Sequence, residues 1–268
     1  SFANGLLTIN KATLTVRAED KQKTYDGQVY SGFTTTITGF VNGENNSVVT
    51  GIVSFIGPAV SAKSAGIYVV EPDISGLLSD NYQFISENGS ILVTKAILTV
   101  NADPKSKIYD GLSFSDFTYN VTGFVNNEDM AVISGKGSFS GSALTAISSG
   151  EYLIQPTTGS LSSSNYRFIF NPSILNIGKA LLTISAENKT KTYDGQAFYS
   201  PQLVFSGFVR GEGYTQLKGA LDLGGTALGA VKAGIYQIVP TQGSLSSANY
   251  SFTFVSGILE ISLSLIHI

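Results

Sequence analysis

The chain has 268 residues, of which 13% are charged and 43% hydrophobic, and its formal net charge is −3 at pH 7. Nucleic-acid-binding domains normally carry a basic surface, so this composition argues against a nucleic-acid partner. The 43% hydrophobic content also excludes an intrinsically disordered chain, and no apolar run reaches the ~18 residues that a membrane-spanning helix needs.

One motif recurs three times at a constant spacing. Tyr25-Asp26-Gly27 returns as Tyr109-Asp110-Gly111 and as Tyr193-Asp194-Gly195, which is 84 residues each time (109 − 25 and 193 − 109). An Asn-Tyr pair keeps the same register in Asn81-Tyr82, Asn165-Tyr166 and Asn249-Tyr250. Self-similarity at a fixed period is typical of a tandem array. An enzyme needs one unique set of residues, so the repetition argues against catalysis.

The period divides the chain into repeats of residues 11–94, 95–178 and 179–262. Residues 1–10 match the last strand of the later repeats, so we expect them to end a truncated preceding repeat. Residues 263–268 match nothing upstream and resemble the translation of a sequencing adapter; His267, the single histidine, lies there. The repeats therefore contain no histidine, which excludes histidine-based catalysis and histidine metal sites within them.

The middle repeat indicates the secondary structure of all three. Residues 96–102 alternate apolar and polar positions, which predicts a half-buried strand. Residues 126–132 begin with capping residues, and their acidic groups lie where a helix amino terminus favours them, so we expect a short helix there. Further strands are expected at 117–122, 137–140, 151–154, 166–170 and 174–177.

Two architectures fit these elements: a β-grasp unit, whose sheet packs on one helix, and an immunoglobulin-like sandwich of two sheets. The helix favours the first. We therefore expect a mainly β chain of three small domains, β-grasp-like, with the immunoglobulin-like sandwich as the alternative. Residues 91–100 join one repeat to the next without Gly or Pro, so we expect a stiff, end-to-end arrangement.

Both recurrent motifs have a structural interpretation. An Asp-Gly pair suits a tight turn, because Gly adopts positive φ and Asp binds the local backbone. The preceding Tyr can pack inward with its hydroxyl at the rim of the core. The Asn-Tyr pair predicts an Asn turn followed by a core tyrosine.

Two chemical alternatives are open at these motifs. Asp26, Asp110 and Asp194 could bind calcium together with Glu19, Asp103 and Glu187, although the spaced acidic loop that calcium prefers is missing. A lysine of each repeat could instead crosslink to Asn81 beside the carboxylate of Glu44, or to the equivalents in the other repeats; the lysines are Lys23, Lys107 and Lys191.

Each repeat carries Lys-X-Tyr-Asp-Gly, Gly-Phe-Val and a following Glu, and Asn-Tyr-X-Phe in one order. In this it resembles the MBG and YDG-type repeats of bacterial surface proteins and adhesins, over residues 11–262. The resemblance implies an extracellular or cell-surface protein and brings no catalytic residue or cofactor. Asn127 stands where the other repeats have Gly43 and Gly211, so we expect that turn to differ in shape.

The sequence therefore predicts a non-enzymatic structural or adhesive array, a stiff stalk or spacer whose first partners are neighbouring repeats of the same chain. The alternative is a set of weak carbohydrate-binding modules whose affinity is multiplied by tandem display. Host or environmental glycans or proteins would then be partners. Burial of the recurrent aromatic side chains would remove the surface that this alternative needs.

Overall fold

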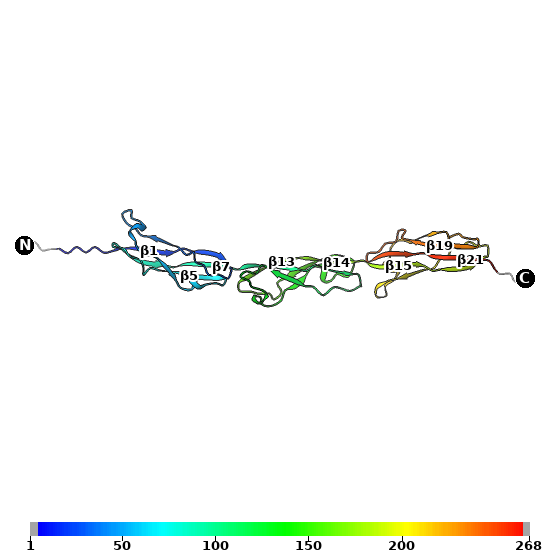
Figure 1. Ribbon diagram of the computed structural model, residues 1–268, viewed down its shortest axis with the longest axis horizontal. Helices are drawn as coiled ribbons and strands as arrows, with labels where there is room; N and C mark the ends of the chain where they lie inside the picture. Colours follow the sequence, from blue (N-terminus) through cyan, green and yellow to red (C-terminus); the bar gives the residue numbers. More distant parts are fainter. Residues whose placement is uncertain (1–4, 265–268) are drawn as a thin grey trace, which may run out of the picture. The chain divides into compact units, whose positions relative to one another are not determined.

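The computed structural model describes residues 5–264 (Figure 1). Residues 1–4 and residues 265–268, the latter part of the adapter-like segment with His267, lie outside the described residues. Each repeat forms one three-stranded and one four-stranded sheet, and the helical elements within residues 5–264 are short 3-10 turns. The mainly β fold is confirmed.

In the first repeat, two chain segments each supply a strand to both sheets. One segment holds β1 and then β2, the other holds β6 and then β7, and β1 pairs parallel with β6 as β2 does with β7. Antiparallel strands complete the sheets, in the orders β3-β1-β6 and β2-β7-β5-β4. The strands are β1 (Ala12–Ala18), β2 (Lys21–Thr24), β3 (Thr35–Thr38), β4 (Ser54–Ile56), β5 (Gly66–Asp73), β6 (Tyr82–Glu87) and β7 (Gly89–Thr94).

The other repeats have the same strand orders. The second contains β8 (Ala96–Ala102), β9 (Lys105–Ile108), β10 (Tyr119–Thr122), β11 (Ser138–Ser140), β12 (Gly150–Thr157), β13 (Tyr166–Asn171) and β14 (Ser173–Gly178). The third contains β15 (Ala180–Ala186), β16 (Lys189–Thr192), β17 (Leu203–Ser206), β18 (Asp222–Gly225), β19 (Gly234–Thr241), β20 (Tyr250–Val255) and β21 (Gly257–Ser262).

Alternation of side chains explains which strands the sequence predicted. In β8, every second residue from Ala96 to Ala102 is buried, because successive side chains of a strand point to opposite faces. Strand β9 was not predicted. Its Lys105-Ser106-Lys107-Ile108 sequence has only one apolar residue, and its pairing with β14 comes from tertiary contact.

The prediction of a helix at residues 126–132 is wrong. The structure has one 3-10 turn, Met130–Val132, capped by Asp129, whose carboxylate accepts a hydrogen bond from the backbone N–H of Ala131 (2.8 Å). The preceding Asn126 and Asn127 have φ of 55° and 57°, a left-handed conformation that does not belong in a right-handed helix. With two sheets and no helix to pack on, each repeat follows the sandwich alternative rather than the β-grasp one.

The turn at Asn127 was also expected to differ from its equivalents, and it does not. Asn127 has φ of 57°, and Gly43 and Gly211 both have φ of 76°. Asparagine tolerates the left-handed region better than most residues, so it preserves the turn where the other repeats use glycine.

The chain divides into two compact units, and each crosses a repeat boundary. The first holds residues up to Val100 with Val121–Ser138 and Thr158–Phe170; the second holds Asn101–Asn120, Phe139–Thr157 and the residues from Asn171 onward. The first unit thus combines the first repeat with part of the second, and the second unit combines the rest of the second repeat with the third.

The hydrophobic cores follow this division. One core packs Tyr25, Val70 and Ile91 of the first repeat against Leu98 and Tyr166 of the second. Another packs residues of the second and third repeats together, among them Tyr109, Leu175, Leu182 and Tyr250. The boundary between two repeats is therefore part of a hydrophobic core in each unit. Four of the recurrent tyrosines, Tyr25, Tyr109, Tyr166 and Tyr250, lie in these cores.

Candidate functional site

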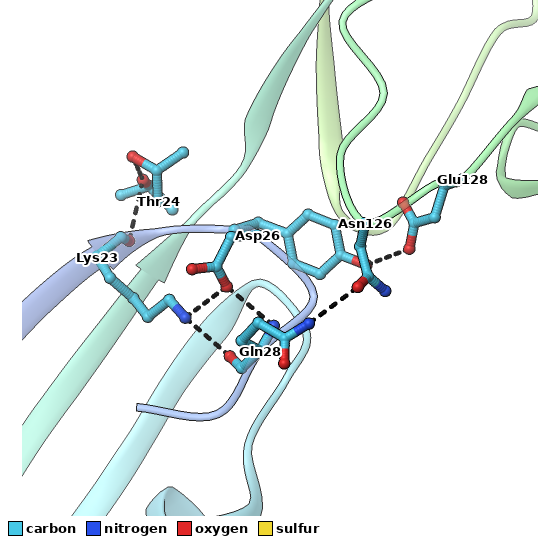
Figure 2. Close-up of polar contacts among 8 residues, drawn as sticks. Lys23, Thr24, Asp26, Gln28, Asn126 and Glu128 are labelled. Atoms are coloured by element: carbon cyan, nitrogen blue, oxygen red, sulfur yellow. Dashed lines mark hydrogen bonds and ion pairs between the residues drawn. The ribbon is translucent and has the colours of Figure 1, made fainter. Parts of the chain in front are cut away.

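The Tyr-Asp-Gly motif forms a turn directly after β2. One carboxylate oxygen of Asp26 accepts hydrogen bonds from the backbone N–H of Gln28 (2.9 Å) and from the Lys23 ammonium group (2.5 Å), as Figure 2 shows. The Lys23 bond, and then the Gln28 N–H, hold the pKa of Asp26 below its ordinary value. Gly27 has φ of 75°. The turns at Asp110 and Asp194 are built in the same way.

The hydroxyl of this turn's tyrosine reaches the next repeat. Tyr25 donates to Oε1 of Glu128 (2.5 Å), and Tyr166 donates to Oε2 of the same carboxylate. The two rings meet edge to face with centroids 5.4 Å apart, an arrangement that aromatic pairs favour. Glu128 thus joins one tyrosine from each repeat.

The second junction repeats this cluster with its own residues. Tyr109 donates to Oε1 of Glu212 (2.5 Å) and Tyr250 donates to Oε2. Their rings also meet edge to face, at 5.7 Å. The two compact units therefore each contain one Tyr–Glu–Tyr cluster that crosses a repeat boundary.

At each junction, the Asn-Tyr motif belongs to the repeat that follows the Tyr-Asp-Gly turn. The Tyr166 hydroxyl accepts a hydrogen bond from the backbone N–H of Val125 (3.0 Å) while it donates to the glutamate. The Asn165 side-chain oxygen accepts from the backbone N–H of Ala65 in the preceding repeat (3.0 Å). Asn249 does the same with Ser149 (3.0 Å). Both residues of the motif thus contribute to the junction.

The glycine of the turn lies against the next repeat. A Cβ atom at Gly27 would come within 2.7 Å of the Asn126 side chain, and one at Gly111 within 2.9 Å of Arg210 Cδ. Gln28 donates to the Asn126 side-chain oxygen (2.9 Å), which is visible in Figure 2. The absence of a side chain at this position lets the turn approach its neighbour closely.

Burial and the nearby carboxylates shift the tyrosine pKa values upward. Burial, and then the bond to Glu128, raise the pKa of Tyr25 to about 12. The bond to Glu212, and then burial, raise the pKa of Tyr109 to about 12. A tyrosinate beside a carboxylate would place two negative charges together, so the cluster holds its phenols in the protonated form.

The remaining motif residues lie at junction surfaces that no other repeat of this chain covers. Tyr193 is 48% exposed, compared with 5% for Tyr25 and Tyr109. Asn81 is exposed, whereas Asn249 is 8% exposed. Tyr82 is buried, and its hydroxyl donates to Glu44 (2.5 Å).

The carboxylates considered for calcium binding have other hydrogen-bond partners in the structure. Glu19 accepts hydrogen bonds from Thr34, Lys21 and Thr36, which hold its pKa at about 2, while Asp26 binds Lys23. No group of three or more His, Cys, Asp or Glu residues that could hold a metal ion occurs within residues 5–264.

The residues considered for a crosslink also have hydrogen-bond partners of their own. Lys23 donates to Asp26 and to the Gln28 carbonyl oxygen, and Asn165 binds a backbone N–H.

Sequence reasoning missed the role of the glutamates. Glu44, Glu128 and Glu212 recur after each Gly-Phe-Val segment, and that recurrence was the available signal. It did not show that each of Glu128 and Glu212 binds a tyrosine of the preceding repeat.

The model of the MBG domain (YGX type) matches residues 14–92, 98–176 and 182–260. The chain belongs to this family. No curated protein matches the chain. Among solved structures, Drosophila N-cadherin EC1-4 is 8% identical with a TM-score of 0.27, covering 95% of this chain and 76% of that one. Drosophila N-cadherin EC1-3 is 9% identical with a TM-score of 0.26, covering 92% of this chain and 98% of that one. Scores this low do not establish a common fold.

No helix of the MBG array, within the described part of the chain, has the length and apolar character to cross a membrane.

Proposed function

We propose that this MBG array is a non-enzymatic spacer of a bacterial extracellular or cell-surface protein, and that its junction clusters hold successive repeats in a fixed orientation. The observation that carries the proposal is the recurrence of one Tyr–Glu–Tyr cluster at both junctions, with matching bonds. Each cluster joins a hydrophobic core that spans the boundary. The cellular location rests on the family resemblance.

Two features of the junction limit its freedom of movement. Hydrogen bonds to a charged carboxylate are shorter and stronger than neutral ones, and two of them meet on Glu128. Bending at the boundary would also expose Tyr25 and Tyr166, which are 5% and 1% exposed. Exposing buried side chains of this size costs roughly 1.5–3 kcal/mol each, so a stiff joint is the low-energy state.

Most of the recurrent tyrosines that a carbohydrate-binding surface would use are not accessible. All recurrent tyrosines of the two motifs except Tyr193 are buried. The exposed Tyr199 and Tyr214 have no aromatic equivalents in the other repeats, so they provide no repeated binding surface.

Small-angle scattering tests the spacer function. An extended array of three repeats predicts a radius of gyration of about 30–35 Å, against about 18 Å for one globule of this length. The double variant Glu128→Gln, Glu212→Gln should bend at its junctions and give a smaller radius. Glu44→Gln is the matched control, because Glu44 binds Tyr82 within one repeat, and it should keep the wild-type radius.

A wild-type radius near that of a globule would contradict the spacer function. An unchanged radius in the double variant, with circular dichroism showing that it is folded, would show that the glutamates do not stiffen the array.

A further inference from the structure

The first and last segments of each repeat lie side by side and run in the same direction. In the first repeat, β1 pairs parallel with β6, and β2 pairs parallel with β7. The third repeat has the same arrangement, β15 with β20 and β16 with β21, and in the second repeat β9 pairs parallel with β14. The strands through which a repeat is joined to the rest of the chain are therefore bonded directly to each other.

The two recurrent motifs close this double ladder at its two ends. The Asn81 carbonyl oxygen accepts a hydrogen bond from the Ala12 N–H (2.9 Å) just before β6, and the Thr94 carbonyl oxygen accepts one from the Tyr25 N–H (2.8 Å) just after β2. The other repeats have matching bonds, from Ala96 to Asn165, Tyr109 to Gly178, Ala180 to Asn249 and Tyr193 to Ser262. The Asn-Tyr and Tyr-Asp-Gly motifs thus mark the first and last bonds of the ladder.

A side chain also bridges the two segments where they pass from one sheet to the other. One carboxylate oxygen of Asp20, which lies between β1 and β2, accepts from the backbone N–H and from the hydroxyl of Ser90 in β7 (2.8 Å each). In the third repeat, the Asn188 side-chain oxygen accepts from the backbone N–H of Ile258 (2.9 Å). The bond therefore recurs with a different acceptor residue.

The direction of these strands determines how a repeat responds to tension. A force on the two ends of a repeat pulls β1 towards its amino end and β7 towards its carboxyl end. Because the paired strands are parallel, this force slides one strand along the other, and the evenly spaced bonds of a parallel ladder are loaded together. Sliding would also draw buried side chains out of the core, among them Leu14, Val16, Ile91 and Val93, and their exposure to water is unfavourable.

We propose that the parallel pairs β1–β6 and β2–β7, bridged by Asp20, form a mechanical clamp that keeps the repeat folded when the chain is under tension. The equivalent pairs do the same in the other repeats. The clamp lies within one repeat, so the proposal does not require that the junctions hold successive repeats in a fixed orientation.

Force spectroscopy on the full chain tests the clamp by changing the direction of pull. The sequence contains no cysteine, so two introduced cysteines fix the points where force is applied. The pair Lys11→Cys, Lys95→Cys loads the first repeat along the clamp. The pair Lys11→Cys, Asp80→Cys instead pulls the amino ends of β1 and β6 apart, so that bonds open one at a time. All three positions are exposed.

Forced unfolding reports the unfolding rate. At one constant force, the pair at residues 11 and 95 should unfold at least about tenfold more slowly than the pair at 11 and 80, because several hydrogen bonds must break together. Each unfolding step of the first pair should lengthen the chain by less than about 300 Å, the span of 84 extended residues.

Asp20→Ala tests the bridge with the handles at residues 11 and 95. This variant should unfold several-fold faster, because hydrogen bonds to a charged carboxylate are lost from the clamp. Asp73→Ala is the matched control. The Asp73 carboxylate also accepts from a serine backbone N–H and a serine hydroxyl, those of Ser75 (3.0 Å) and Ser54 (3.2 Å), but these residues lie outside the paired segments, so its unfolding rate should be that of the wild type.

Equal unfolding rates for the two directions of pull would overturn the proposal. So would Asp20→Ala protein that unfolds at the wild-type rate, or an equal acceleration by Asp73→Ala. Circular dichroism checks that all variants are folded before force is applied. The radius of gyration of the array does not depend on these outcomes, so failure of the clamp and failure of the spacer function are distinguishable.

Discussion

At the scale of single residues, the tyrosine of the Tyr-Asp-Gly turn occurs in two environments within one chain. Tyr25 and Tyr109 are 5% exposed and bind a glutamate of the next repeat, whereas Tyr193 is 48% exposed. The same local sequence therefore provides a built-in comparison between a covered and an uncovered junction.

Removing the Tyr25 hydroxyl should weaken the first junction. Tyr25→Phe leaves Glu128 with one tyrosine partner, and the loss of a hydrogen bond to a charged group costs about 1.5 kcal/mol. The Ala65 amide, which donates across the boundary to Asn165, should then exchange with deuterium about ten times faster. Tyr193→Phe is the control and should leave that rate unchanged; equal effects of both variants would contradict the assigned role of Tyr25.

The raised tyrosine pKa values predict a loss of stability at high pH. The pKa of Tyr25 and of Tyr109 is about 12, against an ordinary value of 10.0. The folded junction binds the proton more tightly than the unfolded chain does, so this stabilisation is complete below pH about 10 and is lost as pH rises to about 12.

Alkaline titration of phenolate absorbance measures this effect directly. Late-titrating phenols should be seen, with Tyr25 and Tyr109 among them, together with a fall in thermal stability over the same pH window. Tyr25→Phe and Tyr109→Phe should each remove one of these phenols. Titration of every phenol at its ordinary value would be inconsistent with the buried clusters.

At the scale of the turn, the three glycines share a conformation but differ in their surroundings. Gly27, Gly111 and Gly195 have φ of 75°, 70° and 77°, so valine imposes the same backbone strain, about 1–2 kcal/mol, at each. Only at Gly27 and Gly111 does an added Cβ atom meet the next repeat.

The stability that each valine substitution costs should therefore depend on the residues that the new side chain meets. Gly27→Val should lose the most stability, about 1 kcal/mol beyond Gly195→Val, because the Cβ meets the base of the Asn126 side chain and overpacking is added to strain. Gly111→Val should fall between them, since the contacting Arg210 side chain is long and can shift. Equal losses in thermal denaturation of the three variants would show that only backbone strain matters.

At the scale of the whole molecule, two hydrophobic cores do not coincide with the sequence period. The first core takes residues from two repeats, so a fragment cut at the repeat boundaries loses part of it. In tandem arrays, the interfaces between neighbours are a separate contribution to stability.

Fragments cut at the period should show this contribution. Residues 95–178 alone lose Tyr25, Val70 and Ile91 as packing partners of Leu98 and Tyr166, which should cost at least ~3 kcal/mol, because two large side chains become exposed. Residues 11–178 keep that core and should be more stable in urea unfolding. Equal stability of the β10-containing sheet in both fragments would mean that each repeat folds independently of its neighbour.

The sequence by itself determined the period, the turn motifs and most of the strands, because these depend on residues close together in the chain. Alternation along β8 and the Asp-Gly turn are examples, and both are visible in a few consecutive residues. The expected helix failed for a local reason that propensity did not reveal, the left-handed conformation of Asn126 and Asn127.

Only the tertiary structure decided where the motifs meet. Tyr25 binds a glutamate 103 residues further along the chain, and Ala65 binds an asparagine 100 residues away. A fixed period shows that Tyr25, Glu44 and Tyr82 recur, but it is equally compatible with pairing within a repeat and with pairing between neighbours. The choice depends on which faces of the sheets come together when the core is buried, and that is a property of the folded chain.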